Sequence, residues 1–216
     1  MQITIREPGS AITHFIAMML AVFAAVPLLV KSGLSAGGQH FAAMVIFIGS
    51  MILLYGASAT YHSVNVTGRN LRVFKKIDHM MIFVLIAGSY TPVCLIVLGG
   101  RIGYQMLMLV WGIALVGMLI KAFWVTCPKW FSSMIYIAMG WVCVLVFGRL
   151  WNTLPTAAFL WLLAGGIIYT IGGVIYALKL PIFNARHKDF GSHEVFHLFV
   201  MGGSICHFIF MYLYVA

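Results

Sequence analysis

The sequence has very few charged residues. Only 8% of its 216 residues are Asp, Glu, Lys or Arg, only four of these are acidic, and 63% of all residues are hydrophobic. Soluble domains carry about one quarter charged residues, so this composition excludes an ordinary water-soluble protein. The chain also lacks low-complexity tracts and charge-rich linkers. We therefore expect residues 1–216 to form a single domain.

Cysteine is scarce as well. The four cysteines are widely spaced and none belongs to a C-x-x-C pair. This spacing excludes a cysteine-based zinc site and a disulfide framework. Three of the four lie within long apolar runs, where we expect them to act as small buried hydrophobic side chains. The cysteines are Cys94, Cys127, Cys143 and Cys206.

What the sequence has in abundance is long runs without a charged residue. There are seven, and each is long enough for a helix to cross a hydrocarbon core about 30 Å thick. The runs show no alternation with a period of two, which excludes a transmembrane barrel. We predict an all-α, polytopic membrane protein with a seven-transmembrane helix bundle. The expected helices are 12–30, 41–62, 77–98, 103–122, 132–149, 156–178 and 193–214.

The basic residues are unevenly distributed between the predicted loops. If the helices alternate in direction, ten of the thirteen lie on the side of the N-terminus, and only Lys31, Arg101 and Arg149 lie on the other. Because Lys and Arg are enriched in cytoplasmic loops, the N-terminus is predicted to be cytosolic and the C-terminus outside. The net charge of +9 is better explained by loops near anionic headgroups than by nucleic acid. We predict membrane lipids as partners and no nucleic acid; nothing in the sequence indicates a protein partner or an oligomeric state.

The strongest chemical motif is H-E-V-F-H, which begins the seventh apolar run at His193 and ends at His197. Two histidines four residues apart lie about one turn apart on one helix face, so one cation can bind both. The same motif occurs in zinc proteases. Those enzymes take a third ligand from further along the chain, but no carboxylate follows Glu194, and His207 lies about 15 Å beyond His197 along a helix. The ordinary zinc-protease interpretation is therefore excluded.

The predicted topology offers a third ligand from a distant helix. The second apolar run ends at His62, on the same side of the membrane as the start of the seventh. Catalytic zinc is held by three protein ligands and keeps one position open for water or substrate. We therefore predict zinc as the cofactor, bound by His62, His193 and His197.

Two more polar residues are predicted at the same depth. Ser58 lies one turn before His62, and Asp78 begins the third predicted helix. Asp78 is a general base or orients a histidine; alternatively, it caps its helix and pairs with a basic residue in 72–76. Ser58 bonds Asp78 or a water at the metal, or else the backbone carbonyl one turn earlier. The predicted catalytic residues are Asp78 and Ser58.

Several stretches together resemble a known family. They are S-A-T-Y-H in the second run, I-D-H followed by I-A-G-S-Y-T-P in the third, and H-E-V-F-H with G-G-S-I-C-H in the seventh. They resemble the haemolysin III family, the bacterial branch of the seven-helix proteins that include the adiponectin and progestin receptors, and are similar to alkaline ceramidases. The resemblance implies zinc on His62, His193 and His197, a water bridged to Asp78, and Ser58 close by. Glu194 is not a zinc ligand in that pattern, and we expect it to cap the seventh helix.

Three hypotheses for the function follow. The first is a zinc-dependent hydrolase of a lipid amide or ester at the cytosolic leaflet. The second is a receptor-like or lipid-homeostasis protein with a structural zinc site. The third is a cytolysin that disrupts membranes, although no apolar run carries a hydrophilic stripe that would line a pore. The bacterial resemblance implies a multi-pass protein of the inner (cell) membrane.

Overall fold

Long helices account for nearly all of the structure. The computed structural model describes residues 5–35, 37–178 and 190–216. The helical segments are α1 (Pro8–Ser35), α2 (Gly38–Ser63), α3 (Gly68–Pro92), η1 (Val93–Leu98), α4 (Gly100–Phe123), α5 (Lys129–Gly140), η2 (Trp141–Val146), α6 (Phe147–Thr153), α7 (Thr156–Leu178), α8 (Ser192–Phe210) and η3 (Met211–Val215).

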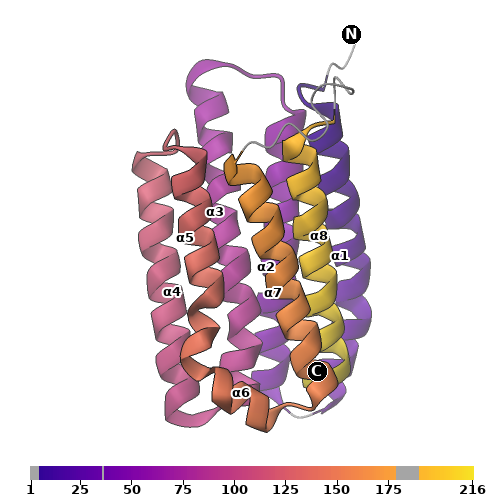
Figure 1. Ribbon diagram of the computed structural model, residues 1–216. Coiled ribbons are helices and arrows are strands. Elements are labelled where there is room, and N and C mark those ends of the chain that lie inside the picture. The colour runs from indigo at the N-terminus through magenta and orange to yellow at the C-terminus, as the bar shows by residue number, and fades with distance from the viewer. Residues whose placement is uncertain (1–4, 36, 179–189) are drawn as a thin grey trace.

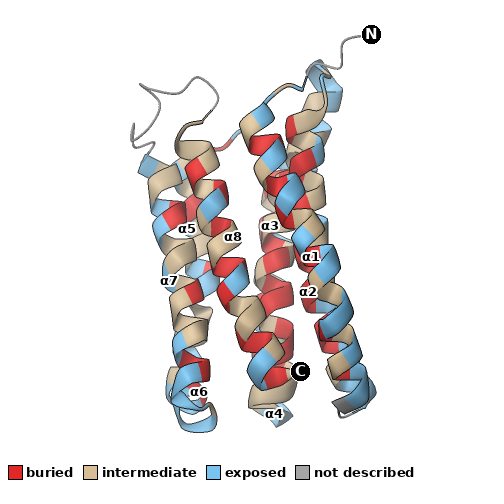
Figure 2. Ribbon diagram, turned by 90° about the vertical axis from the view of Figure 1, so that its right-hand side faces the viewer, coloured by how far each residue is buried: buried red, intermediate tan, exposed pale blue. Residues whose placement is uncertain are grey.

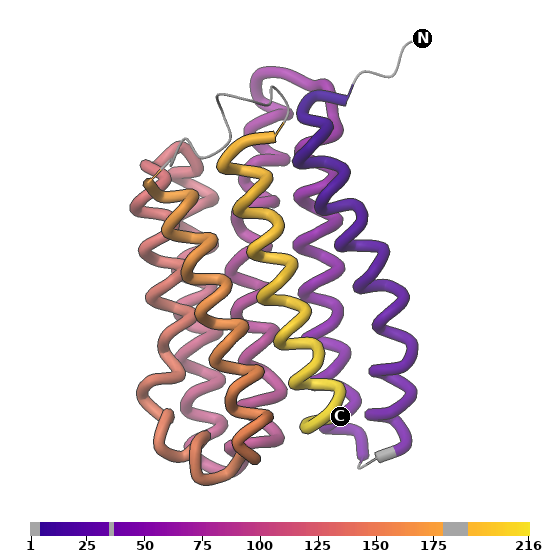
Figure 3. Tube along the Cα trace, turned by 45° about the vertical axis from the view of Figure 1, so that its right-hand side comes forward, coloured from indigo at the N-terminus to yellow at the C-terminus, as the bar shows by residue number. Residues whose placement is uncertain are grey.

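The helices form one bundle with alternating directions (Figures 1 and 3). Helix α2 packs between α1 and α3, α4 packs on α3, and α7 packs between α5 and α8. Helix α8 also contacts α1, so segments from the two ends of the chain lie side by side. The starts of α1, α3, α5 and α8 therefore share one end of the bundle, which we call the N-terminal end, and the C-terminus lies at the other.

The surface of the bundle is apolar, as expected for a protein surrounded by lipid. Within the described residues, seven helices are long and apolar enough to cross a membrane. Large hydrophobic side chains point outward, including Phe23 (68% exposed), Leu145 (71%) and Phe123 (87%), and buried positions face inward (Figure 2). Such a surface is unsuited to water. The predicted all-α bundle of seven membrane helices is confirmed, whereas its orientation in the membrane stays a prediction.

Some helix boundaries differ from the sequence prediction. Helix α3 begins at Gly68 and continues through the basic residues of 69–76, so it starts well before the predicted residue 77. Charged residues limit the part of a helix that can lie in hydrocarbon, but they do not end the helix, because Lys and Arg are good helix formers. Asp78 consequently lies inside α3, so the expectation that it begins this helix was wrong, and so was the alternative that it caps the helix.

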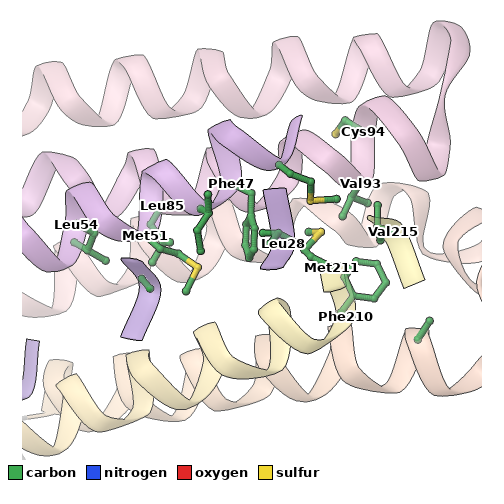
Figure 4. Packing of buried hydrophobic residues seen from close by; sticks show 14 of the residues in the cluster. Leu28, Phe47, Met51, Leu54, Leu85, Val93, Cys94, Phe210, Met211 and Val215 are labelled. Carbon is green, nitrogen blue, oxygen red and sulfur yellow. The ribbon is translucent and has the colours of Figure 1, made fainter. Parts of the chain in front are cut away.

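The apolar core lies mainly toward the end of the bundle that carries the C-terminus. Phe47 of α2, Leu28 of α1 and Phe210 of α8 are fully buried there with Met211 (Figure 4). Helices α7 and α8 approach closely, since a Cβ atom added at Gly203 would meet the ring of Tyr169. Small residues at such contacts are typical of helix packing in membranes. The core thus fixes the helices at one end, and the buried histidines of the cluster, Asp78 and Lys121 lie toward the other.

Candidate metal centre

The three histidines predicted from sequence meet at the N-terminal end of the bundle. His62 lies in the last turn of α2, and His193 and His197 lie in the first two turns of α8. The ring centroids of His62 and His193 are 5.0 Å apart, those of His62 and His197 are 5.3 Å apart, and those of His193 and His197 are 4.5 Å apart. His62 and His197 are each only 2% exposed. The cluster is therefore enclosed by the bundle.

The ring nitrogens have the spacing that a single metal ion requires. Nε2 of His62 and Nε2 of His193 are 3.2 Å apart, and one nitrogen from each of the three rings lies within 4.8 Å of the others. Two nitrogens bound tetrahedrally to zinc at 2.0–2.1 Å lie roughly 3.3 Å from each other. The cluster of His62, His193 and His197 could bind a metal ion.

Hydrogen bonds on the other ring nitrogen hold two of these rings in place. Nδ1 of His62 bonds to a carboxylate oxygen of Glu7, and the backbone N–H of Glu7 donates to the carbonyl of His62 at 3.1 Å. Nδ1 of His197 lies 3.2 Å from the Thr13 hydroxyl. Metal-binding histidines usually donate their second N–H to a carboxylate or another oxygen, which fixes the tautomer. Both contacts leave Nε2 available to a metal, so the residues fit a zinc ion.

Asp78 and Ser58 line the same cavity as His193 and His197. Both are buried, at 7% and 1% exposure, and the Asp78 carboxyl group interacts with the Ser58 side chain. Within the described residues, no ion pair joins Asp78 to a basic residue of 72–76. Asp78 is thus buried and interacts with Ser58, and it also lies within range of the charges of Lys75 and Arg6. Its catalytic role and that of Ser58 stay predictions.

Glu194 does not join the histidine cluster. Its carboxylate accepts a hydrogen bond from the backbone N–H of Gly191 at 2.7 Å and another from the Ser10 hydroxyl. It therefore caps the start of α8, as expected. It also ties α8 to the first turn of α1.

Sequence reasoning missed two residues beside the histidine cluster, both at the start of the chain. Glu7 contacts the ring of His62 and Thr13 contacts the ring of His197, as described above. His14, near the start of α1, is 3% exposed and stacks on His197 with a centroid distance of 3.5 Å. The rarity of acidic residues was a signal for Glu7, since only four occur in the chain. Nothing in the local spacing pointed to Thr13.

A cavity opens from the histidine cluster into the bundle. Its volume is about 180 Å³, far more than the roughly 10–15 Å³ that one water needs. His193, His197, Ser58 and Asp78 line it near the N-terminal end, and it continues between apolar side chains as far as Phe159. The site therefore combines a polar, metal-compatible end with a long apolar interior.

Comparison with known proteins places this arrangement in a family. Residues 2–208 match the family described as "Haemolysin-III related". The chain belongs to the haemolysin III family. It is a multi-pass membrane protein homologous to bacterial haemolysin-3, and it is related to the adiponectin and progestin receptor-like proteins.

The bacterial relatives are similar along almost their whole length. "Hemolysin-3" of Bacillus cereus is 34% identical over 211 residues, which cover 97% of this chain and 92% of the relative. "Hemolysin-3 homolog" of Bacillus subtilis (strain 168) is 35% identical over 212 residues, which cover 98% and 95%. "Adiponectin receptor protein" of Drosophila melanogaster is 22% identical, over 94% of this chain but only 49% of the relative. The haemolysin III chain therefore corresponds to about half of the animal receptor.

Replacing Glu7 by glutamine should weaken zinc binding about 10- to 100-fold, the usual effect of losing an outer partner of a metal ligand. The physical reason is that His62 loses the carboxylate that fixes its tautomer and ring orientation. The zinc dissociation constant of the purified protein, obtained by competition with a chelator, measures the effect. Glu194→Gln is the matched control, because it removes a carboxylate at the same end that contacts Ser10 and Gly191 instead of a ligand ring. An equal loss in both variants would contradict a specific role for Glu7.

Proposed function

We propose that the chain is a zinc-dependent hydrolase that cleaves an amide or ester bond of a membrane lipid. The observation that supports this most is that His193 and His197 of the three-histidine cluster line the mainly apolar cavity of about 180 Å³, as does Asp78. A chain of methylene groups suits the apolar part. A carbonyl group at the end of that chain would lie beside the histidines and the carboxylate.

The residues have distinct roles in this proposal. His62, His193 and His197 would hold zinc through Nε2, and Glu7 and Thr13 would keep two of the rings in orientation. Zinc at this position supplies a Lewis acid that polarises a carbonyl group and lowers the pKa of water. Asp78 would take the proton from the water whose oxygen bonds to the carbonyl carbon, and would return it to the leaving amine or alcohol as the C–N or C–O bond breaks. Ser58 would hold the Asp78 carboxyl group.

The proposed orientation puts the site at the cytosolic leaflet of the inner membrane of a bacterium. Among the described residues, seven of the ten basic residues belong to the N-terminal end, and three, Lys31, Arg101 and Arg149, belong to the other. The three basic residues Lys179, Arg186 and Lys188 lie outside the described residues. This charge distribution supports a cytosolic N-terminus.

A structural metal in a receptor-like protein is the second candidate. The similarity to the Drosophila protein named as an adiponectin receptor favours it. Zinc would then only join α2 to α8, and no lipid would be cleaved. Membrane disruption, which the name "Hemolysin-3" suggests for the Bacillus cereus relative, fits less well, because the cavity is lined mainly by apolar side chains.

The hydrolase proposal is tested with purified protein and lipids from a bacterial membrane. The zinc-loaded protein is incubated with a total lipid extract, and released fatty acids are identified by mass spectrometry. We expect zinc-dependent release of fatty acid from one lipid class, its loss after chelation, and its return when zinc is added. If a preparation with one bound zinc per chain releases nothing from the extract, the hydrolase proposal is wrong and the structural-metal candidate is favoured.

A further inference from the structure

A second polar cluster lies at the N-terminal end, apart from the metal ligands. Lys121, near the end of α4, is only 1% exposed. Its ammonium group donates to the Ser132 hydroxyl and to the Cys127 sulfur, the latter at 3.0 Å, and lies 5.7 Å from the centroid of the Tyr136 ring. A lysine is rarely buried to this extent unless an anion accompanies it.

Within residues 5–35, 37–178 and 190–216, no carboxylate forms an ion pair with this ammonium group. Among the described residues, Glu7 is the acidic residue that forms ion pairs, and its partners are Arg6 and His62. A buried charge without a counter-charge costs several kcal/mol of folding free energy. The cost falls if a negatively charged ligand comes close to Lys121.

The cavity lies directly next to this cluster. Ser132 and Ser133, the fourth and fifth residues of α5, both line it, and the Ser133 hydroxyl is buried without a hydrogen-bond partner. Nδ1 of His79, which also lines the cavity, is buried and unpartnered too. Such orphaned polar atoms are uncommon in native structures and indicate a missing partner. The first turn of α5 adds partial positive charge from its backbone N–H groups.

These groups are arranged so that hydroxyl hydrogens can point into the cavity. Because the Lys121 ammonium donates to the Ser132 oxygen, the Ser132 O–H can donate to another group. Its protein partners are the Cys127 sulfur at 3.2 Å, where either atom can be the donor, and the Pro128 carbonyl at 3.4 Å. The Ser133 O–H is free. Two hydroxyl donors backed by an ammonium group are suited to an oxyanion, and hydrogen bonds to charged groups are the stronger kind.

We propose that Lys121, Ser132, Ser133 and His79 form an anion subsite for a phosphate or carboxylate group of the lipid whose chain occupies the cavity. The subsite and the metal ligands border the same cavity, and His79 is the neighbour of Asp78 in α3. A lipid bound there places its anionic group on α5 and its apolar chain in the cavity enclosed by α3, α5, α7 and α8. The anion subsite rests on the proposed function in one respect, namely that a lipid occupies the cavity. It narrows the proposed substrates to lipids with an anionic group.

An internal ion pair between Lys121 and a Cys127 thiolate is the alternative. It would supply a counter-charge without any ligand. It would leave the Ser133 hydroxyl and the His79 nitrogen unpartnered, however, whereas an oxyanion in the cavity provides a partner for both. The two arrangements predict different results. The anion subsite requires that the affinity for an anionic ligand depend on Lys121, whereas the internal ion pair requires that the stability of the protein depend on Cys127.

The test measures binding and needs no turnover, so it is independent of whether the protein is a hydrolase. Zinc-loaded protein in a non-ionic detergent is titrated calorimetrically with tetradecyl phosphate, with uncharged tetradecanol and with inorganic phosphate. We expect tetradecyl phosphate to bind at least about ten-fold more tightly than tetradecanol. This is the gain in affinity expected from one additional hydrogen bond to a charged group. This preference should disappear in Lys121→Met and fall in the conservative variant Ser133→Ala. It should persist in Lys76→Met, which removes a charge from the same end outside the cavity, and in Cys127→Ser.

Three results would overturn the subsite. One is the absence of any preference for the phosphate compound in the wild type. Another is an unchanged preference in Ser133→Ala and Lys121→Met proteins whose thermal unfolding is normal, because the phosphate would then bind elsewhere, for example at zinc. A third is inorganic phosphate that binds as tightly as tetradecyl phosphate, since the site would then serve a free anion and not a lipid.

Discussion

Replacing Asp78 by asparagine should reduce lipid turnover by about 10²- to 10⁴-fold while zinc remains bound. This is the usual contribution of a positioned general acid or base. Asparagine has nearly the same size as aspartate and can keep a contact with Ser58, but it cannot accept the proton of the attacking water. Turnover is measured as fatty acid release per bound zinc, so that a change in metal content is not mistaken for a change in chemistry.

The control for this variant is Glu194→Gln. It removes a carboxylate from the same end of the bundle, and Glu194 contacts the start of α8 without lining the cavity. We expect it to retain turnover within a few-fold and to lose some stability, because a helix cap is typically worth about 1 kcal/mol. If Asp78→Asn hydrolyses lipid at the wild-type rate, Asp78 is not the proton acceptor. If it loses zinc together with activity, its role is structural.

Replacing His62 by alanine should have the largest effect on metal binding. The two remaining ligands come from adjacent turns of α8, and zinc sites use three or four protein ligands. The loss of affinity should exceed the roughly 10- to 100-fold expected when only an outer partner is removed. Zinc per chain after purification and dialysis, determined by inductively coupled plasma mass spectrometry, measures it.

His14→Phe is the matched control for His62→Ala. His14 is buried and stacked on His197, yet it does not belong to the group of nitrogens within 4.8 Å of one another. Phenylalanine preserves a ring for stacking and removes both nitrogens. We expect this variant to keep about one zinc per chain. Equal zinc loss in both variants would mean that the ligand set includes His14 or that the site depends on packing alone.

The sequence predicted the bundle well because hydrocarbon imposes a strong requirement on helix length and composition. Runs without charge located all seven helices, and the alternation of helix direction placed His62 at the same end as His193 and His197. Helix limits were less predictable. Helix α3 continues through several basic residues to Gly68, because the charge that prevents entry into lipid does not prevent a helix from extending beyond it.

The surroundings of the histidines could not be predicted in the same way. The contact between Glu7 and His62 joins residues 55 positions apart, and that between Thr13 and His197 joins residues 184 apart. Both depend on how α1 packs between α2 and α8, which no periodicity encodes. The cavity and the orphaned Ser133 hydroxyl are likewise properties of packing. Residue spacing and predicted topology identified the three clustered histidines, and only the fold revealed what surrounds them.

Zinc K-edge X-ray absorption on the purified wild-type protein and on His62→Ala tests the shared metal site most directly. We expect one zinc per wild-type chain with three imidazole nitrogens at about 2.0–2.1 Å and no sulfur near 2.3 Å, and we expect this signature to be lost in His62→Ala. A sulfur ligand, or an unchanged coordination shell in His62→Ala, would contradict a metal shared between α2 and α8.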